Sequence, residues 1–220
     1  MRKAGDLMKE KVDSIIEILK NRYPDALCAL HYEKDYELMI AVRLSAQCTD
    51  ARVNLVTPAL FAAYPTLEDM AAADIADVEN YVRSCGFYKH KARDIVLGCQ
   101  MLLTDYGGKV PGTMEELLRI PGVGRKTANV IQSVVWGKAA LAVDTHVFRV
   151  SHRIGLVPKS CTTPLAVEKQ LMKHIPEAIV PKAHHWLILH GRYVCVARKP
   201  KCEECGLNGI CAYSIKPTNL

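Results

Sequence analysis

The chain has 220 residues, of which half are hydrophobic, and its formal net charge is +6 at pH 7. This composition excludes an intrinsically disordered chain, and the length allows one large domain or two small ones. The moderately basic charge suits a polyanionic partner without establishing one. No apolar run approaches the roughly 20 residues that span a bilayer, and no export signal is visible. We therefore expect an intracellular protein without a membrane partner, in the cytoplasm or nucleoid if the source is bacterial.

Hydrophobic residues recur at helical spacing along nearly the whole chain, and convincing period-two strands are absent. The sequence therefore predicts an all-α protein. Asp50 is expected to cap the third helix, and Thr66 begins a Thr-x-x-Asp helix start. Thr113 with Glu116 is expected to form a capping box. The least helical joint, residues 137–143, is a candidate boundary between two lobes. The predicted helices cover residues 6–22, 35–45, 50–64, 73–82, 88–105, 113–118, 124–136, 144–155, 164–174 and 182–194.

The segment Ile120-Pro-Gly-Val-Gly-Arg-Lys-Thr-Ala128 indicates a helix, a tight turn and a second helix. Gly122 and Gly124 allow positive φ and remove side-chain bulk, so the turn backbone can lie against another molecule. The first N–H groups of the following helix lie at the positive end of its dipole and favour a phosphate. A Gly-x-Gly pair alone is more often an ordinary turn. The full segment, however, resembles the helix-hairpin-helix of the endonuclease III superfamily of DNA glycosylases. The resemblance implies that this hairpin, including Arg125, grips the DNA backbone.

Lys126 lies in the first turn of the second hairpin helix, where a lysine is ordinarily a solvated surface charge. The positive end of the helix dipole disfavours its ammonium form, and a neutral amine is the nucleophile of Schiff-base chemistry. Asp144 precedes a predicted helix and is interpreted first as its N-cap. Asp144 follows Lys126 by 18 residues. At this spacing, the sequence Val143-Asp144-Thr145-His146 resembles the catalytic region of the same superfamily.

The resemblance implies a bifunctional DNA N-glycosylase and abasic-site (AP) lyase of base excision repair that removes oxidised pyrimidines. A damaged nucleotide is flipped out of the duplex, and Lys126 attacks C1′ of its sugar. Asp144 stabilises the positive charge that develops on the sugar. The base leaves, a Schiff base forms, and β-elimination cleaves the strand 3′ to the abasic site. The adenine-specific branch of the superfamily lacks the lysine, so Lys126 favours the bifunctional interpretation.

Nine cysteines are present, and four of them lie near the C-terminus with the spacing x6-x2-x5. Four thiolates without histidine fit either zinc or a [4Fe–4S] cluster, and the spacing alone does not separate the two. The pattern resembles the [4Fe–4S] loop of the endonuclease III superfamily, which favours the iron–sulfur cluster. Arg198, Lys199 and Lys201 lie in this loop and are either simply solvated or, on a rigid cluster, a cationic surface for DNA phosphates. The expected ligands are Cys195, Cys202, Cys205 and Cys211.

Two further segments resemble lesion-probing loops of the superfamily. In Leu44-Ser-Ala-Gln-Cys-Thr-Asp50, the resemblance implies that Gln47 enters the gap left by the flipped nucleotide. In Gly86-Phe87-Tyr88, it implies that Phe87 wedges between bases, where the superfamily more commonly has leucine. From the residues alone, Gln47 is a polar helix-terminal residue and Phe87 a core residue. Arg149 and Arg192 complete the expected DNA contacts.

The resemblance extends from about residue 10 to residue 213 and implies a two-lobed helix-hairpin-helix glycosylase fold. One lobe, residues 28–138, is a six-helix barrel that bears the hairpin. The other lobe, residues 1–27 with 139–220, is the iron–sulfur domain. The expected partner is double-stranded DNA with a damaged or abasic nucleotide, bound by a monomer. The alternatives are a monofunctional glycosylase for mismatched or alkylated bases and a non-catalytic DNA-binding or redox module.

Overall fold

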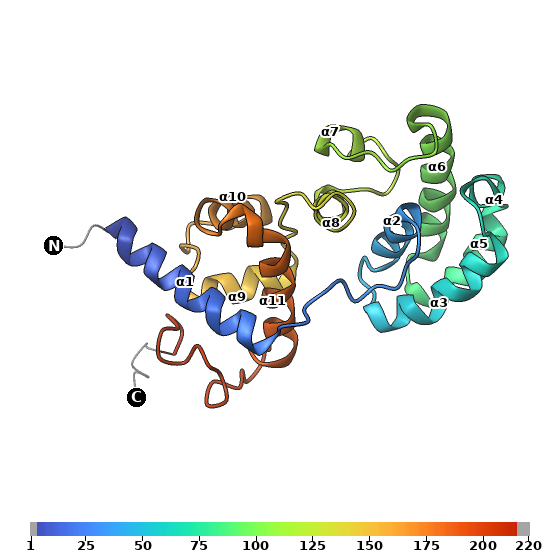
Figure 1. Ribbon diagram of the computed structural model, residues 1–220. Helices are drawn as coiled ribbons and strands as arrows, with labels where there is room; N and C mark the ends of the chain where they lie inside the picture. Colours follow the sequence, from blue (N-terminus) through green and yellow to red (C-terminus); the bar gives the residue numbers. More distant parts are fainter. Residues whose placement is uncertain (1–3, 215–220) are drawn as a thin grey trace. The chain divides into compact units, whose positions relative to one another are not determined.

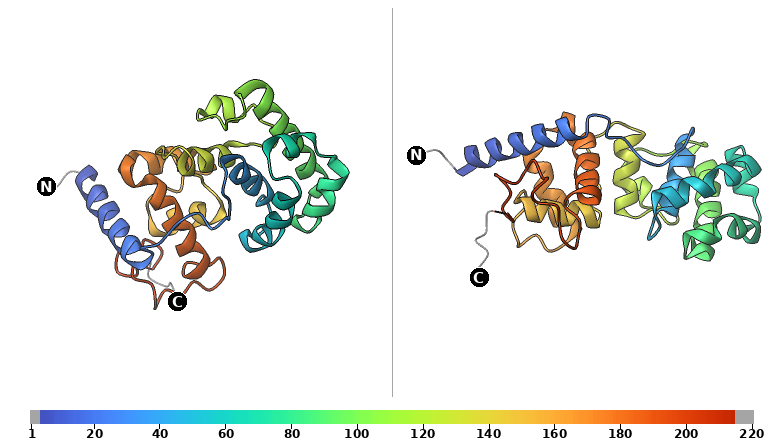
Figure 2. Two further views of the ribbon diagram at one scale, coloured as in Figure 1. Left: turned by 45° about the vertical axis from the view of Figure 1, so that its right-hand side comes forward. Right: turned by 90° about the horizontal axis from the view of Figure 1, so that it is seen from below.

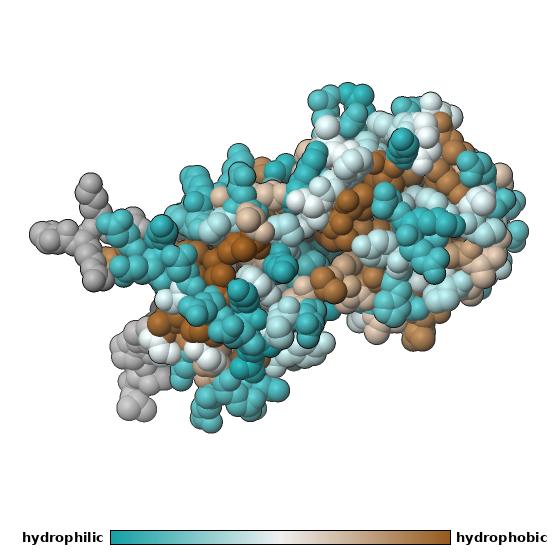
Figure 3. Space-filling model, in the orientation of Figure 1, coloured by the Kyte–Doolittle hydropathy of each residue, from teal (hydrophilic) through white to brown (hydrophobic). Residues whose placement is uncertain are grey.

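The computed structural model describes residues 4–214, which form helices and connecting loops without any β-strand (Figure 1). The predicted all-α class is confirmed for this part of the chain. No helix within it is long and apolar enough to cross a membrane. The chain divides into two compact units, residues 28–138 and residues 1–27 with 139–220. In each unit hydrophilic side chains cover much of the visible face, with hydrophobic residues gathered in patches between them (Figure 3).

In the unit of residues 28–138, α6 is the central helix and contacts α2, α4 and α5, while α8 contacts α2 and α7 (Figure 2). The apolar faces that the sequence periodicity predicts are buried, including Leu38, Ile95 and Leu102. The elements of this unit are α2 (Asp35–Leu44), α3 (Asp50–Ala63), α4 (Leu67–Ala72), α5 (Ile75–Val82), the 3₁₀ turn η1 (Arg83–Cys85), α6 (Tyr88–Tyr106), α7 (Met114–Leu117) and α8 (Arg125–Val134).

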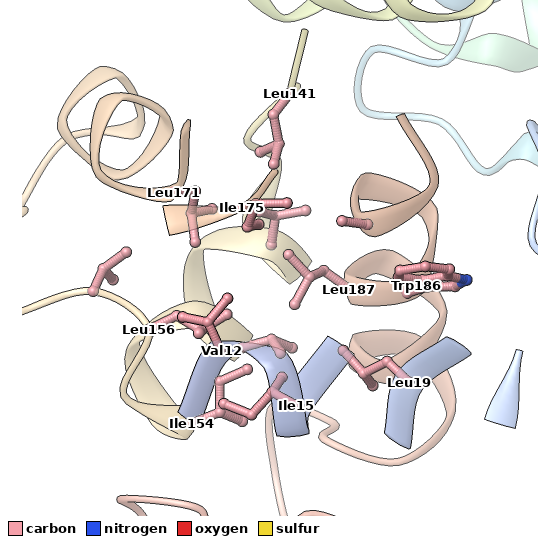
Figure 4. Close-up of a cluster of buried hydrophobic side chains, with 14 of the residues drawn as sticks. Val12, Ile15, Leu19, Leu141, Ile154, Leu156, Leu171, Ile175, Trp186 and Leu187 are labelled. Atoms are coloured by element: carbon pink, nitrogen blue, oxygen red, sulfur yellow. The ribbon is translucent and has the colours of Figure 1, made fainter. Parts of the chain in front are cut away.

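The other unit joins the N-terminal helix to the C-terminal half of the chain around one hydrophobic core (Figure 4). Val12, Ile15 and Leu19 of the first helix are buried with Leu187 and Trp186, and the Trp186 Nε1–H donates to the Tyr23 carbonyl at 3.1 Å. Burying such side chains contributes about 1.5–3 kcal/mol each. The elements are α1 (Ala4–Arg22), α9 (Thr145–Ile154), α10 (Pro164–His174), the 3₁₀ turn η2 (Glu177–Ile179) and α11 (Val180–Tyr193). They are followed by the segment of residues 195–211, called here the cysteine loop.

Two predicted helix starts are wrong in detail. Thr49, and not Asp50, caps α3, because its hydroxyl accepts from the Arg52 amide at 3.2 Å. The predicted helix of residues 73–82 begins two residues later than expected, since Ala73 is extended at φ −63° and ψ 141°. Helix α5 begins after Asp74, whose carboxylate accepts from the Ala76 amide at 2.7 Å. A strong cap here overrides the helix propensity of the alanines.

The capping boxes are also distributed differently from the prediction. Thr113 caps α7 as expected, but the Glu116 carboxylate accepts from the Thr113 hydroxyl at 2.6 Å and the predicted reciprocal box does not form. The reciprocal box occurs instead at Thr66, whose hydroxyl accepts from the Asp69 amide while the Asp69 carboxylate accepts from the Thr66 amide. Each satisfied amide fixes the first turn of its helix.

Candidate functional site

The turn between α7 and α8 is closed by a hydrogen bond from the Val123 amide to the Ile120 carbonyl at 3.0 Å. Gly122 has φ +76°, and a Cβ there would lie 2.5 Å from Nε of Arg43 and 2.7 Å from a carboxylate oxygen of Asp94. Both the conformation and the space therefore require glycine at this position. The expectation for Gly124 is wrong in part, because its φ of −92° is ordinary and a Cβ would meet nothing within 4 Å. The protein itself leaves the space beside Gly124 open.

Helix α8 begins directly after Gly124, which has no side chain to cap it. Its buried face, including Thr127, Ala128 and Ile131, packs into the unit, while Arg125 and Lys126 in the first turn are exposed. The first amides of a helix have no intrahelical partners and lie at the positive end of its dipole. The hairpin therefore presents N–H groups, a guanidinium and an amine together on one exposed helix end. Such an end is suited to an anion such as a phosphate.

Asp144 is the N-cap of α9, as the sequence predicts, and its Oδ1 accepts from the Val147 amide at 2.8 Å. The side chain is half-buried, and a carboxylate at a helix N-terminus is stabilised by the dipole. Because one oxygen suffices for the cap, the carboxylate retains a second oxygen for another interaction. Asp144 belongs to the unit of residues 1–27 with 139–220, whereas Lys126 belongs to the unit of residues 28–138.

Gln47 and Phe87, from different loops of one unit, line the same surface pocket with Ala46 and His90. Both residues have left-handed backbones, with φ of +54° and +49°. That conformation costs a non-glycine residue on the order of 1–2 kcal/mol. Phe87 is 63% exposed, so the interpretation as a core residue is excluded. Strained backbones and an exposed aromatic ring at one pocket are typical of a functional surface.

The same unit contains two buried or half-buried cations that the sequence does not reveal. Lys91 is 1% exposed and donates to three backbone carbonyls. Arg43 Nε donates to the Asp94 carboxylate at 2.8 Å and so joins α2 to α6 beside Gly122. In the sequence these residues are ordinary charges on helices, and only their burial distinguishes them.

Between Cys195 and Cys202, the cysteine loop presents its cations on a fixed backbone. The guanidinium of Arg153 donates to the carbonyls of Val196 at 2.8 Å and Ala197 at 2.9 Å. The Lys201 amide donates to the Val194 carbonyl at 3.0 Å. The cationic side chains of this segment are exposed, and the backbone of Lys199 is left-handed with φ +53°. The exposed cations are Arg198, Lys199 and Lys201, of which Lys199 is left-handed.

All four C-terminal cysteines line one pocket together with Arg153 and His190. Burial raises the pKa of Cys205, and the charges of the other three thiols raise it further, against a backbone hydrogen bond that lowers it. His190 Nε2 lies 3.6 Å from the Cys205 sulfur, and an Arg153 N–H lies 3.6 Å from the Cys195 sulfur. Mutually repelling sulfurs with cationic and N–H neighbours fit a metal-bound set of thiolates. In the described part of the chain, no three histidine, cysteine, aspartate or glutamate side chains converge as around a single metal ion.

The two remaining predicted arginines lie on the unit with the cysteine loop. The Arg149 guanidinium is half-buried and donates to the carbonyls of Gly191 at 2.8 Å and Cys195 at 3.1 Å. It therefore ties α9 to the start of the cysteine loop. Arg192 is half-buried near the end of α11.

Burial, followed by the charge of Arg22, lowers the pKa of His190 to about 4, so this ring is neutral at pH 7 and packs within the unit.

Comparison with known proteins gives matches over nearly the whole chain. The family model of the HhH-GPD superfamily of base excision DNA repair proteins matches residues 40–177. The model of the iron–sulfur binding domain of endonuclease III matches residues 195–211. Endonuclease III of Rickettsia felis is 44% identical over 206 residues, which are 94% of this chain and 96% of the relative. Endonuclease III of Synechocystis sp. is 46% identical over 204 residues, 92% of each chain.

A solved structure shows the same similarity in three dimensions. It is a trapped endonuclease III–DNA covalent intermediate, an estranged-adenine complex, with 46% sequence identity to this chain. The TM-score is 0.88, and the match covers 94% of this chain and 96% of that one. The resemblance inferred from the motifs is thereby confirmed for sequence and fold together.

The two hairpin glycines provide a matched pair of substitutions. Gly122→Ala should destabilise the protein by more than about 1–2 kcal/mol, because it combines a left-handed backbone with a collision against Arg43 and Asp94. Gly124→Ala should change stability by less than about 0.5 kcal/mol, because its Cβ meets no protein atom. Urea unfolding followed by circular dichroism measures both. Equal stabilities of the two variants would contradict the interpretation that only Gly122 is required by the fold.

Proposed function

Because the chain belongs to the HhH-GPD superfamily of base excision DNA repair proteins, and within it to the endonuclease III family, we propose that it removes oxidised pyrimidines and then nicks the DNA strand. Base removal is the DNA N-glycosylase step, and nicking is the AP lyase step. The observation that carries the proposal is the position of Lys126, an exposed amine in the first turn of the hairpin helix. The covalent DNA intermediate trapped for the similar endonuclease III supports a covalent step here.

Lys126 is the proposed nucleophile. Its amine forms a bond to C1′ of the damaged nucleotide, and the bond from C1′ to the base breaks with departure of the base. The lysine nitrogen loses a proton, and the C1′–O4′ bond breaks as O4′ takes up a proton, which opens the sugar ring and leaves an iminium between the lysine and C1′. The iminium loses a proton from C2′, and that electron pair forms the C2′–C3′ double bond as the C3′–O bond breaks and releases the 3′ phosphate. Water then hydrolyses the imine and frees the lysine. Asp144 is proposed to stabilise the positive charge on the sugar while its Oδ1 caps α9.

The chain carries the iron–sulfur domain of endonuclease III and, with it, a [4Fe–4S] cluster. We propose Cys195, Cys202, Cys205 and Cys211 as the cluster ligands, because they line one pocket in which their charges repel. The bound cluster supplies four cross-links that hold the loop of residues 195–211, which is otherwise poor in regular structure. Arg153 supports the loop from α9 through its bonds to Val196 and Ala197.

The proposed partner is double-stranded DNA containing a damaged or abasic nucleotide, bound by a monomer. The hairpin residues Gly122, Gly124 and Arg125 are proposed to bind phosphates, since the space beside Gly124 is open and the helix end favours anions. Gln47 and Phe87 are proposed to fill the gap left by the flipped nucleotide. The exposed cations of the cysteine loop, Arg198, Lys199 and Lys201, supply further phosphate contacts, as does Arg192. Arg149 acts mainly by tying α9 to that loop.

Borohydride reduction tests the nucleophile. Wild-type protein mixed with thymine glycol or abasic DNA and borohydride should give a covalent complex, because the imine is reduced to a stable amine. Lys126→Gln should abolish trapping, whereas Lys109→Gln, which removes another exposed lysine of the same unit, should leave it unchanged. Base release without trapping by the wild type would indicate a monofunctional glycosylase and would overturn the lyase mechanism.

Asp144→Asn separates the structural role of this residue from its chemical role. Asparagine caps a helix as well as aspartate does, so stability should change by less than about 0.5 kcal/mol. Loss of the negative charge should lower the single-turnover rate of base release by on the order of 100-fold or more. Asp144→Ala, which also loses the bond to the Val147 amide, should cost about 1 kcal/mol of stability in addition. Wild-type rates for Asp144→Asn would show that the residue is only a cap.

Lys199→Glu tests the cationic surface of the cysteine loop. The variant should bind undamaged and lesion DNA more weakly to a similar degree, and the slope of log affinity against log salt should fall by roughly one phosphate contact. Lys169→Glu changes the net charge equally at an exposed position on α10 and serves as the control. Fluorescence anisotropy at several salt concentrations measures both. An unchanged salt slope for Lys199→Glu would remove this loop from the DNA interface.

A further inference from the structure

We propose that Lys91 is a positioning residue that holds the loops of Gln47 and Phe87 in the one arrangement able to probe a lesion. This inference rests on the function proposed above. It assigns a role to a buried side chain that contacts neither the reacting sugar nor the cluster loop.

Lys91 is almost completely enclosed, with 1% of its surface exposed, and it lines the pocket of Gln47 and Phe87. Its ammonium donates to the carbonyls of Leu44 at 2.8 Å, Ala46 at 2.7 Å and Cys85 at 2.8 Å. All three donors of the ammonium are therefore used. Among the described residues, no carboxylate forms an ion pair with it.

The three acceptors lie where two helices end. Leu44 is the last residue of α2 and Cys85 is the last residue of η1. Carbonyls at a helix C-terminus lack intrahelical partners and form the negative end of the dipole, so a cation satisfies them well. One ammonium thus closes both helix ends and fixes the distance between the two loops that leave them.

Each left-handed residue follows an acceptor by one or two residues. Gln47 comes one residue after Ala46, and Phe87 comes two residues after Cys85. The backbone amide of Lys91 also donates to the Phe87 carbonyl at 3.1 Å, so this residue holds the Phe87 loop at two points. A positive φ in a non-glycine residue persists only where the surroundings hold it. The Lys91 bonds restrain the backbone within two residues of both strained residues.

The energetic cost of the arrangement also favours a positioning role. Burial lowers the pKa of Lys91, which shows that enclosure disfavours its charge. An apolar side chain of similar volume would fill the same space without that cost, although it would leave the three carbonyls unsatisfied. A buried cation that joins two loops contributes a unique geometry more than it contributes stability.

The test uses the intact, cluster-containing protein with the variants Lys91→Met and Lys91→Gln. Methionine keeps an unbranched stem that ends at Cε and removes every donor, and glutamine keeps an amide that bonds to at most two carbonyls. Arg93→Met removes an exposed cation from the same helix and is the control. The readout is the ratio of affinities for a duplex with a stable abasic-site analogue and the same duplex undamaged. A misplacement of about 1 Å can cost on the order of 100-fold, so we expect this ratio to fall at least roughly tenfold in both Lys91 variants.

Affinity for undamaged DNA should remain within about twofold of wild type, because phosphate contacts elsewhere carry it. A merely structural role would lower both affinities alike. The double variant Lys91→Gln with Gln47→Ala should be no more impaired than the worse single variant, because both changes remove the same probe. An unchanged ratio in the folded Lys91→Gln variant, or multiplied losses in the double variant, would overturn the inference. A wild-type protein without preference for the lesion duplex would instead overturn the proposed function itself.

Discussion

The ion pair between Arg43 and Asp94 is the contact on which the side of its unit proposed to bind DNA depends. It joins α2 to α6, and Gly122 lies so close against it that no side chain fits there. Both groups are about four-fifths buried, so the pair is less screened by solvent than a surface salt bridge. Helix α2 leads to Gln47, helix α6 begins beside Phe87, and the hairpin rests on the pair. Three elements proposed to touch DNA therefore share one polar support.

Backbone strain is concentrated at residues proposed to meet DNA. The non-glycine residues with positive φ in the described chain are Gln47, Phe87 and Lys199. Their side chains are exposed, so local burial does not offset the free-energy cost of the left-handed backbone. The surrounding folds hold them instead, through Lys91 in one unit and through Arg153 with the cysteine loop in the other. Such positions exchange stability for a prepared binding surface.

Sequence periodicity predicted the longer helices because most of them have an apolar face, and the Asp144 cap followed from its place before such a run. The break at Ala73 was missed because alanine favours helix and only the Asp74 cap reverses that preference. The two hairpin glycines are alike in sequence, yet only Gly122 needs a positive φ. Lys91 was not recognised because burial of a lysine depends on tertiary packing. The match of motifs, and not periodicity, led to the family.

A helix N-terminus serves two opposite purposes in this protein. At α9 it carries Asp144, where the dipole and the Val147 amide stabilise a carboxylate and fix its direction. At α8 it carries Lys126, which lies exposed beside backbone N–H groups suited to phosphate. One helix end therefore fixes the direction of a carboxylate, and the other exposes an amine. The proposed chemistry needs both, a carboxylate for a cationic sugar and an amine for C1′, and each of them is placed by the first turn of a helix.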